Sequence, residues 1–196
     1  MKIKEMDKLT EHFEKCFNQK CGYVFHKDFS KPHIDVLLFE PNEEYPFYKL
    51  VTMGASDYKM PRGNDGINFN RNEYMLFLNK DFDLNSDKLN FYMNFIDYIA
   101  SFSYWEKTRV TRYHSFDIEE DAHEQYKAAF IMDPKVIKDE NISVCKLGIL
   151  KKCLCLQLMP ITKEELDELF KVKGAEFSKN FYPDNGEYNF LADRLE

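Results

Sequence analysis

The sequence predicts an α+β fold in which helices pack on a mixed, largely antiparallel sheet. Several segments have the apolar run or the alternation of strands, and others have the apolar spacing or the capping residues of helices. Hydrophobic residues make up 44% of the chain, with 18 Phe and 12 Tyr, which favours a substantial core over disorder. At 196 residues the chain has the size of one large domain. No linker or composition break divides it, so we expect a single domain over residues 1–196.

The first part of the chain predicts one helix and two strands. Apolar residues at helical spacing favour an amphipathic helix over residues 6–17, which ends before Cys21-Gly22. Residues 34–39 are apolar on both faces, as expected of a strand buried inside a sheet. A turn that contains Pro41 and two acids then leads to a second strand over residues 47–53.

The middle of the chain predicts a third strand and a second helix. Residues 60–72 have the composition of a loop, and a strand follows over 73–79. Ser86 is a suitable N-cap for a helix over 89–105. Apolar side chains occupy most of the circumference of this helix, which predicts that protein covers most of it. Its last residue, Trp105, is therefore expected to fill the core.

The next part predicts a long loop followed by strands. Residues 106–124 have the character of a loop, and the alternation over 126–132 favours a strand that Asp133-Pro134 closes. Residues 142–159 are β-prone throughout. A hairpin turn at Lys151-Lys152 would lack the Gly or Asn that tight turns prefer. Whether the chain turns there is therefore left undecided. One face of the segment carries Leu154, Leu156 and Leu158.

A third helix and an unassigned tail complete the chain. Thr162 and Glu165 have the spacing of a capping box and open a helix that Gly174 is expected to cap at its end. The tail from Glu176 contains a turn at Asp184-Asn185-Gly186 and is not assigned further.

Charge and composition restrict the class of function. The net charge of −7 disfavours nucleic acid as a partner and is compatible with a basic protein. No apolar run reaches the roughly 20 residues that span a bilayer, and the first residues lack the apolar region of a secretion signal. Five cysteines, with Cys153 and Cys155 in an apolar run, favour reduced core thiols. We expect a cytoplasmic protein with no membrane partner.

The order of short motifs resembles that of the suppressor-of-fused family. A buried strand ends at Glu40-Pro41, an acidic turn follows, and a Tyr-rich strand runs into Gly54-Ala55-Ser56-Asp57. Family members carry a strand, a Pro-acidic turn, a Tyr-rich strand and a Gly-x-Ser-Asp loop in that order. The resemblance extends over about residues 33–175. Its later matches are His114, Asp133-Pro134, Pro160-Ile161-Thr162-Lys163-Glu164-Glu165-Leu166 and Gly174.

The resemblance implies a non-catalytic protein-binding module. The chain looks like the short bacterial members, which consist of one domain and are thought to be immunity proteins that neutralise a polymorphic toxin. Animal members add a second domain and hold a transcription-factor peptide as an added β-strand between their two halves, so that pocket is not carried over whole. A regulator that sequesters a transcription factor stays an alternative.

The loop at Gly54, Ser56 and Asp57 is the first candidate partner-binding site, together with the neighbouring Tyr48 and Tyr58. Asp57 and Ser56 could present a carboxylate and a hydroxyl to a partner, or they could cap nearby backbone N–H groups. A serine nucleophile is not supported, because the Gly-x-Ser-x-Gly elbow is missing and no base is identifiable beside Ser56.

His114 and the acidic segment after it form the second candidate partner-binding site. Its carboxylates could simply be solvated, or they could receive a basic toxin surface. A rival hypothesis is a hydrolase or metal-dependent enzyme that uses Asp57 and His114. The histidines lack the close spacing that zinc sites need, so we expect no metal and no cofactor. The acidic candidates are Asp117, Glu119, Glu120 and Asp121.

Overall fold

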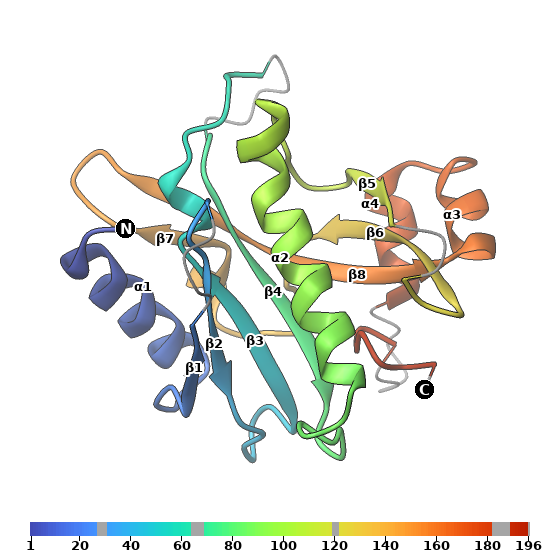
Figure 1. The fold of residues 1–196 in the computed structure, drawn as a ribbon, viewed down its shortest axis with the longest axis horizontal. Coiled ribbons are helices and arrows are strands. Elements are labelled where there is room, and N and C mark those ends of the chain that lie inside the picture. Colours follow the sequence, from blue (N-terminus) through green and yellow to red (C-terminus); the bar gives the residue numbers. More distant parts are fainter. Residues whose placement is uncertain (27–30, 64–68, 119–121, 182–188, 196) are drawn as a thin grey trace.

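A computed structural model describes residues 1–26, 31–63, 69–118, 122–181 and 189–195 (Figure 1). The helices are α1 (Ile3–Cys16), α2 (Lys88–Glu106), α3 (Lys163–Leu169) and α4 (Gly174–Phe177), with 3-10 turns η1 (Ala55–Asp57), η2 (Glu140–Ser143) and η3 (Ser178–Phe181). The strands are β1 (Tyr23–Phe25), β2 (Asp35–Phe39), β3 (Phe47–Met53), β4 (Asn72–Asn79), β5 (Ser115–Asp117), β6 (Tyr126–Met132), β7 (Val144–Lys146) and β8 (Lys152–Thr162).

Within these residues the strands form one eight-stranded sheet. The strand order is β1-β2-β3-β4-β8-β6-β5, and β7 pairs with β8 on the edge that β6 also uses. Neighbouring strands run antiparallel except β4 and β8, which pair in parallel between residues 72–75 and 154–157. The predicted α+β fold with a mixed, largely antiparallel sheet is therefore confirmed.

Helices cover both faces of the sheet. α2 crosses the face toward the viewer in Figure 1, and its Ile96 and Ile99 belong to the same buried apolar cluster as Leu154, Leu156 and Leu158. The three leucines are at most 2% exposed, so they point into the core as predicted, and the other face of the strand is buried as well. The opposite face packs against α1, α3 and α4 in a second apolar cluster. None of the described helices is long and apolar enough to cross a membrane.

The C-terminal segment, residues 189–195, closes the gap where β4 and β8 diverge. The Ala192 N–H donates to the Phe77 carbonyl at 2.7 Å, and the Gln157 side chain donates to the Phe190 carbonyl at 2.9 Å. The Asp193 carboxylate accepts from the Asn79 N–H at 2.9 Å. This tail, which the sequence left unassigned, is therefore part of the core. The turn predicted at residues 184–186 lies outside the described residues.

Two predicted boundaries were wrong, for local reasons, and the structure locates the hairpin turn that the sequence left undecided. Ser86 does not cap α2, because its hydroxyl donates to the Asp83 carbonyl and the N-cap is Asp87. Gly174 does not end α3 but begins α4, where a Cβ would lie 2.5 Å from Cβ of Tyr113. The hairpin between β7 and β8 turns over residues 147–151, where two N–H groups donate to the Lys151 carbonyl.

Two predictions of burial and loop character were also wrong. Residues 106–124 are not a continuous loop, since β5 pairs with β6 within them. Trp105 does not fill the core: its side chain is 49% exposed, as Tyr98 is at 40%, and its indole N–H donates to the Lys31 carbonyl at 3.2 Å. One side of α2 is therefore open to solvent.

Candidate functional site

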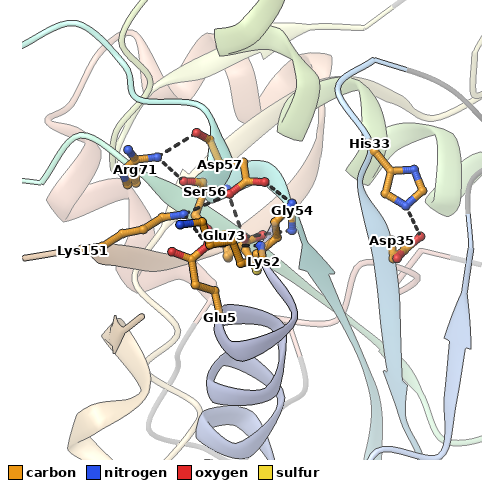
Figure 2. A network of polar contacts seen from close by, with 11 residues as sticks. Lys2, Glu5, His33, Asp35, Gly54, Ser56, Asp57, Arg71, Glu73 and Lys151 are labelled. Atoms are coloured by element: carbon orange, nitrogen blue, oxygen red, sulfur yellow. Dashed lines mark hydrogen bonds and ion pairs between the residues drawn. The ribbon is translucent and has the colours of Figure 1, made fainter. Parts of the chain in front are cut away.

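The loop Gly54–Asp57 wraps its backbone around the carboxylate of Glu73 (Figure 2). Glu73 lies on β4 and is fully buried. One carboxylate oxygen accepts from the N–H groups of Gly54 at 3.1 Å and Ser56 at 3.0 Å, and the other accepts from the Thr52 hydroxyl at 2.6 Å. Burial raises the pKa of Glu73, and these hydrogen bonds partly offset that effect.

The loop needs glycine at its first position. Gly54 has φ 132°, and a Cβ there would lie 2.4 Å from the His33 carbonyl oxygen. Ser56 is fully buried, and its neighbour Arg71 donates to the carbonyls of Ser56 at 2.6 Å and Asp57 at 2.8 Å. The Gly-x-Ser-Asp motif thus places its Gly and Ser in the interior, where the backbone binds an internal acid.

The Asp57 side chain belongs to an ion cluster at the molecular surface. Its carboxylate pairs with the Lys151 ammonium at 3.0 Å and with the amino group of Met1. Lys151 also pairs with Glu5 at 3.0 Å. Partial burial acts to raise the pKa of Asp57, but these cations hold it below its ordinary value. Asp57 is 41% exposed and engages these cations with its side chain.

Of the other predicted residues, Tyr58 directly follows the loop, and its N–H donates to the Ala55 carbonyl at 3.2 Å. Tyr48 is half-buried on the α2 side of the sheet, and the Tyr58 ring meets that of Tyr104 at 5.7 Å near the end of α2. His114 and Asp117 are exposed at β5. Of the acidic candidates, Glu119, Glu120 and Asp121 lie outside the described residues.

The structure does not bring Asp57 and His114 together. Asp57 follows β3 and His114 precedes β5, and the strands β4, β8 and β6 lie between those two in the sheet. His33, which precedes β2, contacts Asp35 at the start of that strand at 3.3 Å. Across the residues that the structure describes, no three His, Cys, Asp or Glu side chains are placed to hold a metal ion. The five cysteines are free thiols, and all but Cys21 are buried.

A groove of about 440 Å³ lies along α2, with Ile118 and Ala122 also in its lining, and we call it the α2 groove. Its apolar wall comes from aromatic residues of α2, and Ile118 and Ala122 form part of the opposite wall. The rings of Phe102 and Phe116 meet at 4.7 Å and hold β5 against the helix. The α2 residues that line the groove are Phe91, Asn94, Phe95, Asp97, Tyr98 and Trp105.

The aromatic wall follows from a pattern in the sequence. Phe91, Phe95, Tyr98, Phe102 and Trp105 recur at alternating steps of four and three residues, which places them on one helix face. Sequence reasoning missed this face because apolar residues occur around the whole helix. The exposure of Tyr98 and Trp105 singles it out in the structure.

Acidic residues lie close in sequence to the residues that line the α2 groove. Asp97 is part of the lining, and three exposed acids are near lining residues, namely Glu106 at the end of α2, Asp117 in β5 and Glu124 before β6. The sequence adds Glu119, Glu120 and Asp121 between β5 and β6. The arrangement combines half-exposed aromatic rings with a negative border, which suits a basic, partly apolar ligand surface.

Comparison with known proteins identifies the family. The family model "Suppressor of fused protein (SUFU)" matches residues 30–189. No curated protein matches the sequence. Among solved structures, a putative SUFU homologue from Neisseria gonorrhoeae aligns with TM-score 0.68 and 14% identity over 95% of this chain and 93% of that one.

Two further structures share the fold. A chain from the Sufu-Fu complex aligns with TM-score 0.68 and 9% identity over 98% of this chain and 91% of that one. Drosophila Suppressor of Fused aligns with TM-score 0.67 and 10% identity over 98% of this chain, which spans 50% of the Drosophila chain. The family model covers most of the sequence, and these folds agree with it. The chain belongs to the suppressor of fused family.

Proposed function

We propose that this chain is a non-catalytic protein-binding module that neutralises a toxin domain by covering its active site. The partner docks in the α2 groove through a basic surface with an apolar centre. The observation that carries the proposal is the pairing of a half-exposed aromatic face on α2 with an acidic border.

The aromatic residues supply the binding energy in this proposal. Tyr and Trp are enriched among the few interface residues that dominate affinity, because they bury a large area with little loss of rotamer freedom. Tyr98 and Trp105 are 40% and 49% exposed, so each has a substantial part of its side chain left to bury. Phe91, Phe95 and Phe102 support them from the same helix face.

In this proposal the acidic border orients the approaching partner and raises the rate of association. Exposed carboxylates attract a basic partner over distances up to the Debye length, about 8–10 Å at moderate salt. Asp117 directly precedes Ile118, and Glu124 follows shortly after Ala122, and both Ile118 and Ala122 line the groove. A partner strand could also add to β1, which ends the strand order of the sheet.

Three observations support a binding module over an enzyme. The Asp57 carboxylate is engaged with Lys151 and Met1, and Ser56 is buried. His114 is separated from Asp57 by three strands. In addition, a structural neighbour of this chain is part of the Sufu-Fu complex, a protein assembly.

Growth rescue tests the proposal. The domain encoded beside this chain would be expressed in a bacterial host, with and without this chain, and its inhibition of growth measured. We expect rescue by the wild type. We expect the double variant Tyr98→Ala/Trp105→Ala to lose rescue and to bind the purified domain at least about 30-fold more weakly.

The control is Phe170→Ala, which removes a ring that is 72% exposed at the end of α3, outside the α2 groove. It should rescue growth as the wild type does. Equal rescue by the groove variant would overturn the assignment of the α2 groove, and catalytic turnover by the purified chain that requires Asp57 would overturn the binding function.

A further inference from the structure

The hairpin between β7 and β8 ends in two aliphatic residues that are almost completely exposed. The side chains of Ile149 and Leu150 are 99% and 98% exposed, whereas Leu147, at the start of the same turn, is buried. The turn is ordered by hydrogen bonds from the N–H groups of Leu147 and Gly148 to the Lys151 carbonyl at 2.9 and 3.0 Å. We call residues 148–150 the hairpin tip.

Cations gather around the hairpin tip. Leu150 borders a pocket of about 390 Å³ whose lining includes Lys59, Arg62 and Arg109. Lys146 and Lys152, which pair across the base of the hairpin, are both exposed. The whole chain carries a net charge of −7, so this group of cations differs in sign from the charge of the molecule as a whole.

The hairpin tip and the pocket together form a surface that suits an amphipathic ligand, one with an apolar part and an anionic part. Leu150 is shared by both, so an apolar projection lies directly beside a cationic recess. An anionic bilayer presents the matching pattern over its whole surface, with phosphates in one layer and hydrocarbon just below. A protein partner would instead need a cavity fitted to this projection, with an acid beside it.

We propose that the hairpin tip docks this protein on an anionic lipid bilayer. Ile149 and Leu150 enter the hydrocarbon boundary, and Lys59, Arg62 and Arg109 contact lipid phosphates. The attachment is peripheral, and it revises the expectation from the sequence that the protein has no membrane partner. This surface shares no residue with the α2 groove, so the two proposals stand or fall separately.

Vesicle sedimentation tests the proposal with the full chain. The probes are vesicles of phosphatidylcholine alone and vesicles with roughly one-third phosphatidylglycerol, whose negative surface attracts lysine and arginine side chains. We expect the wild type to sediment with the anionic vesicles only. We expect Ile149→Ser/Leu150→Ser and Lys59→Glu/Arg62→Glu each to lower the partition coefficient at least about tenfold.

Matched substitutions away from this surface serve as controls. Phe170→Ser removes an exposed apolar side chain and Lys171→Glu reverses an exposed charge, both at the end of α3. Both should sediment as the wild type does. Absence of wild-type binding to anionic vesicles overturns the proposal. Loss in the charge variant with full binding by the Ser variant also overturns it, and points to an acidic ligand that does not take up the apolar tip.

Tryptophan fluorescence locates the contact. Trp105, the only Trp, reports on the α2 groove, and Leu150→Trp in a Trp105→Phe background reports on the hairpin tip. Anionic vesicles should shift the emission of the tip reporter to shorter wavelength and leave that of wild-type Trp105 unchanged. A shift of Trp105 with none at the tip would place lipid at the α2 groove and overturn the proposal.

Discussion

Gly54 shows how one residue determines the local path of the chain. Its positive φ turns the backbone after β3 so that the N–H groups of Gly54 and Ser56 point at Glu73. The buried acid therefore gains donors from the backbone, as buried polar groups require. The functional motif suggested by sequence is, at this scale, an internal binding site for a carboxyl group.

Gly54→Ala should therefore lower the free energy of unfolding by about 2–3 kcal/mol or more, because strained φ and the close contact with the His33 carbonyl act together. Urea denaturation measures this loss. Gly148→Ala is the matched control, since its added Cβ would meet only the Lys151 side chain at 3.7 Å. Equal stability of the two variants would contradict this account of the loop.

Lys49 is a second residue with a measurable consequence. Its side chain is fully buried, and its ammonium donates to the carbonyls of Glu40 at 2.7 Å and Tyr45 at 3.3 Å. It lies 5.8 Å from the ring centre of Phe17 and 5.6 Å from that of Phe47. Burial lowers the pKa of Lys49 to about 8, from an ordinary value of 10.5.

The pH dependence of stability follows from this lowered pKa. Between about pH 8 and 10.5 the unfolded chain binds the Lys49 proton and the folded chain does not, so folding stability rises with pH in that window. The free energy of unfolding rises by an amount on the order of 3 kcal/mol across this window. Urea denaturation of Lys49→Met and the wild type at pH 7.5 and 10.5 measures this contribution of Lys49, because all other groups titrate in both proteins. Parallel pH profiles of the two proteins would show that Lys49 does not titrate there.

At the scale of elements, strand β8 connects the two halves of the sheet. It pairs with β4 on one side and with β7 and β6 in succession on the other. Its side chains alternate between the two cores, so Leu154, Leu156 and Leu158 face α2, and Cys153 and Cys155 face the other layer. Alternation along this strand was legible from the sequence.

Leu156→Ala should cost about 2–5 kcal/mol, since it removes apolar volume from a site with no exposure. Leu150→Ala on the same hairpin makes the same chemical change at 98% exposure and should cost less than about 0.5 kcal/mol. Thermal or urea denaturation of the pair provides the measurement. A cost below about 0.5 kcal/mol for Leu156→Ala would mean that this face of β8 does not pack on α2.

At the scale of the molecule, local pattern predicted elements well and their assembly less well. The bounds predicted for β3 and β6 are those observed, because an aromatic or alternating run between turn residues identifies a strand without its neighbours. The parallel pairing of β4 with β8 joins segments far apart in the sequence, and no local signal encodes it. The tail at 189–195 is defined by the gap it fills, so its role depends on the finished sheet.

For the candidate site too, the sequence showed the separate parts but not how the fold brings them together. The acidic segment after His114 and the aromatic residues of α2 were both visible in the sequence. That Ile118 and Trp105 border one groove depends on how β5 packs beside α2, through contacts such as Phe102 with Phe116. The role of Glu73 was equally hidden, because an acid in an apolar strand gives no sign of which loop will enclose it.

The charge border of the α2 groove leads to a prediction about association with the proposed toxin partner. Stopped-flow mixing should give an on-rate that falls as salt rises, since ions screen the attraction between exposed charges. Asp117→Lys and Glu124→Lys should lower the on-rate severalfold and leave the off-rate nearly unchanged, because both residues are exposed beside the groove.

Glu43→Lys separates this steering from the effect of net charge. It makes the same charge change at an exposed turn before β3, outside the α2 groove. It should have a much smaller effect on the on-rate, and all three variants should keep wild-type stability to within about 0.5 kcal/mol. If Glu43→Lys slowed association as much as the variants beside the groove, the attraction would come from the net charge of the molecule, and the acids beside α2 would lose their role in orienting the partner.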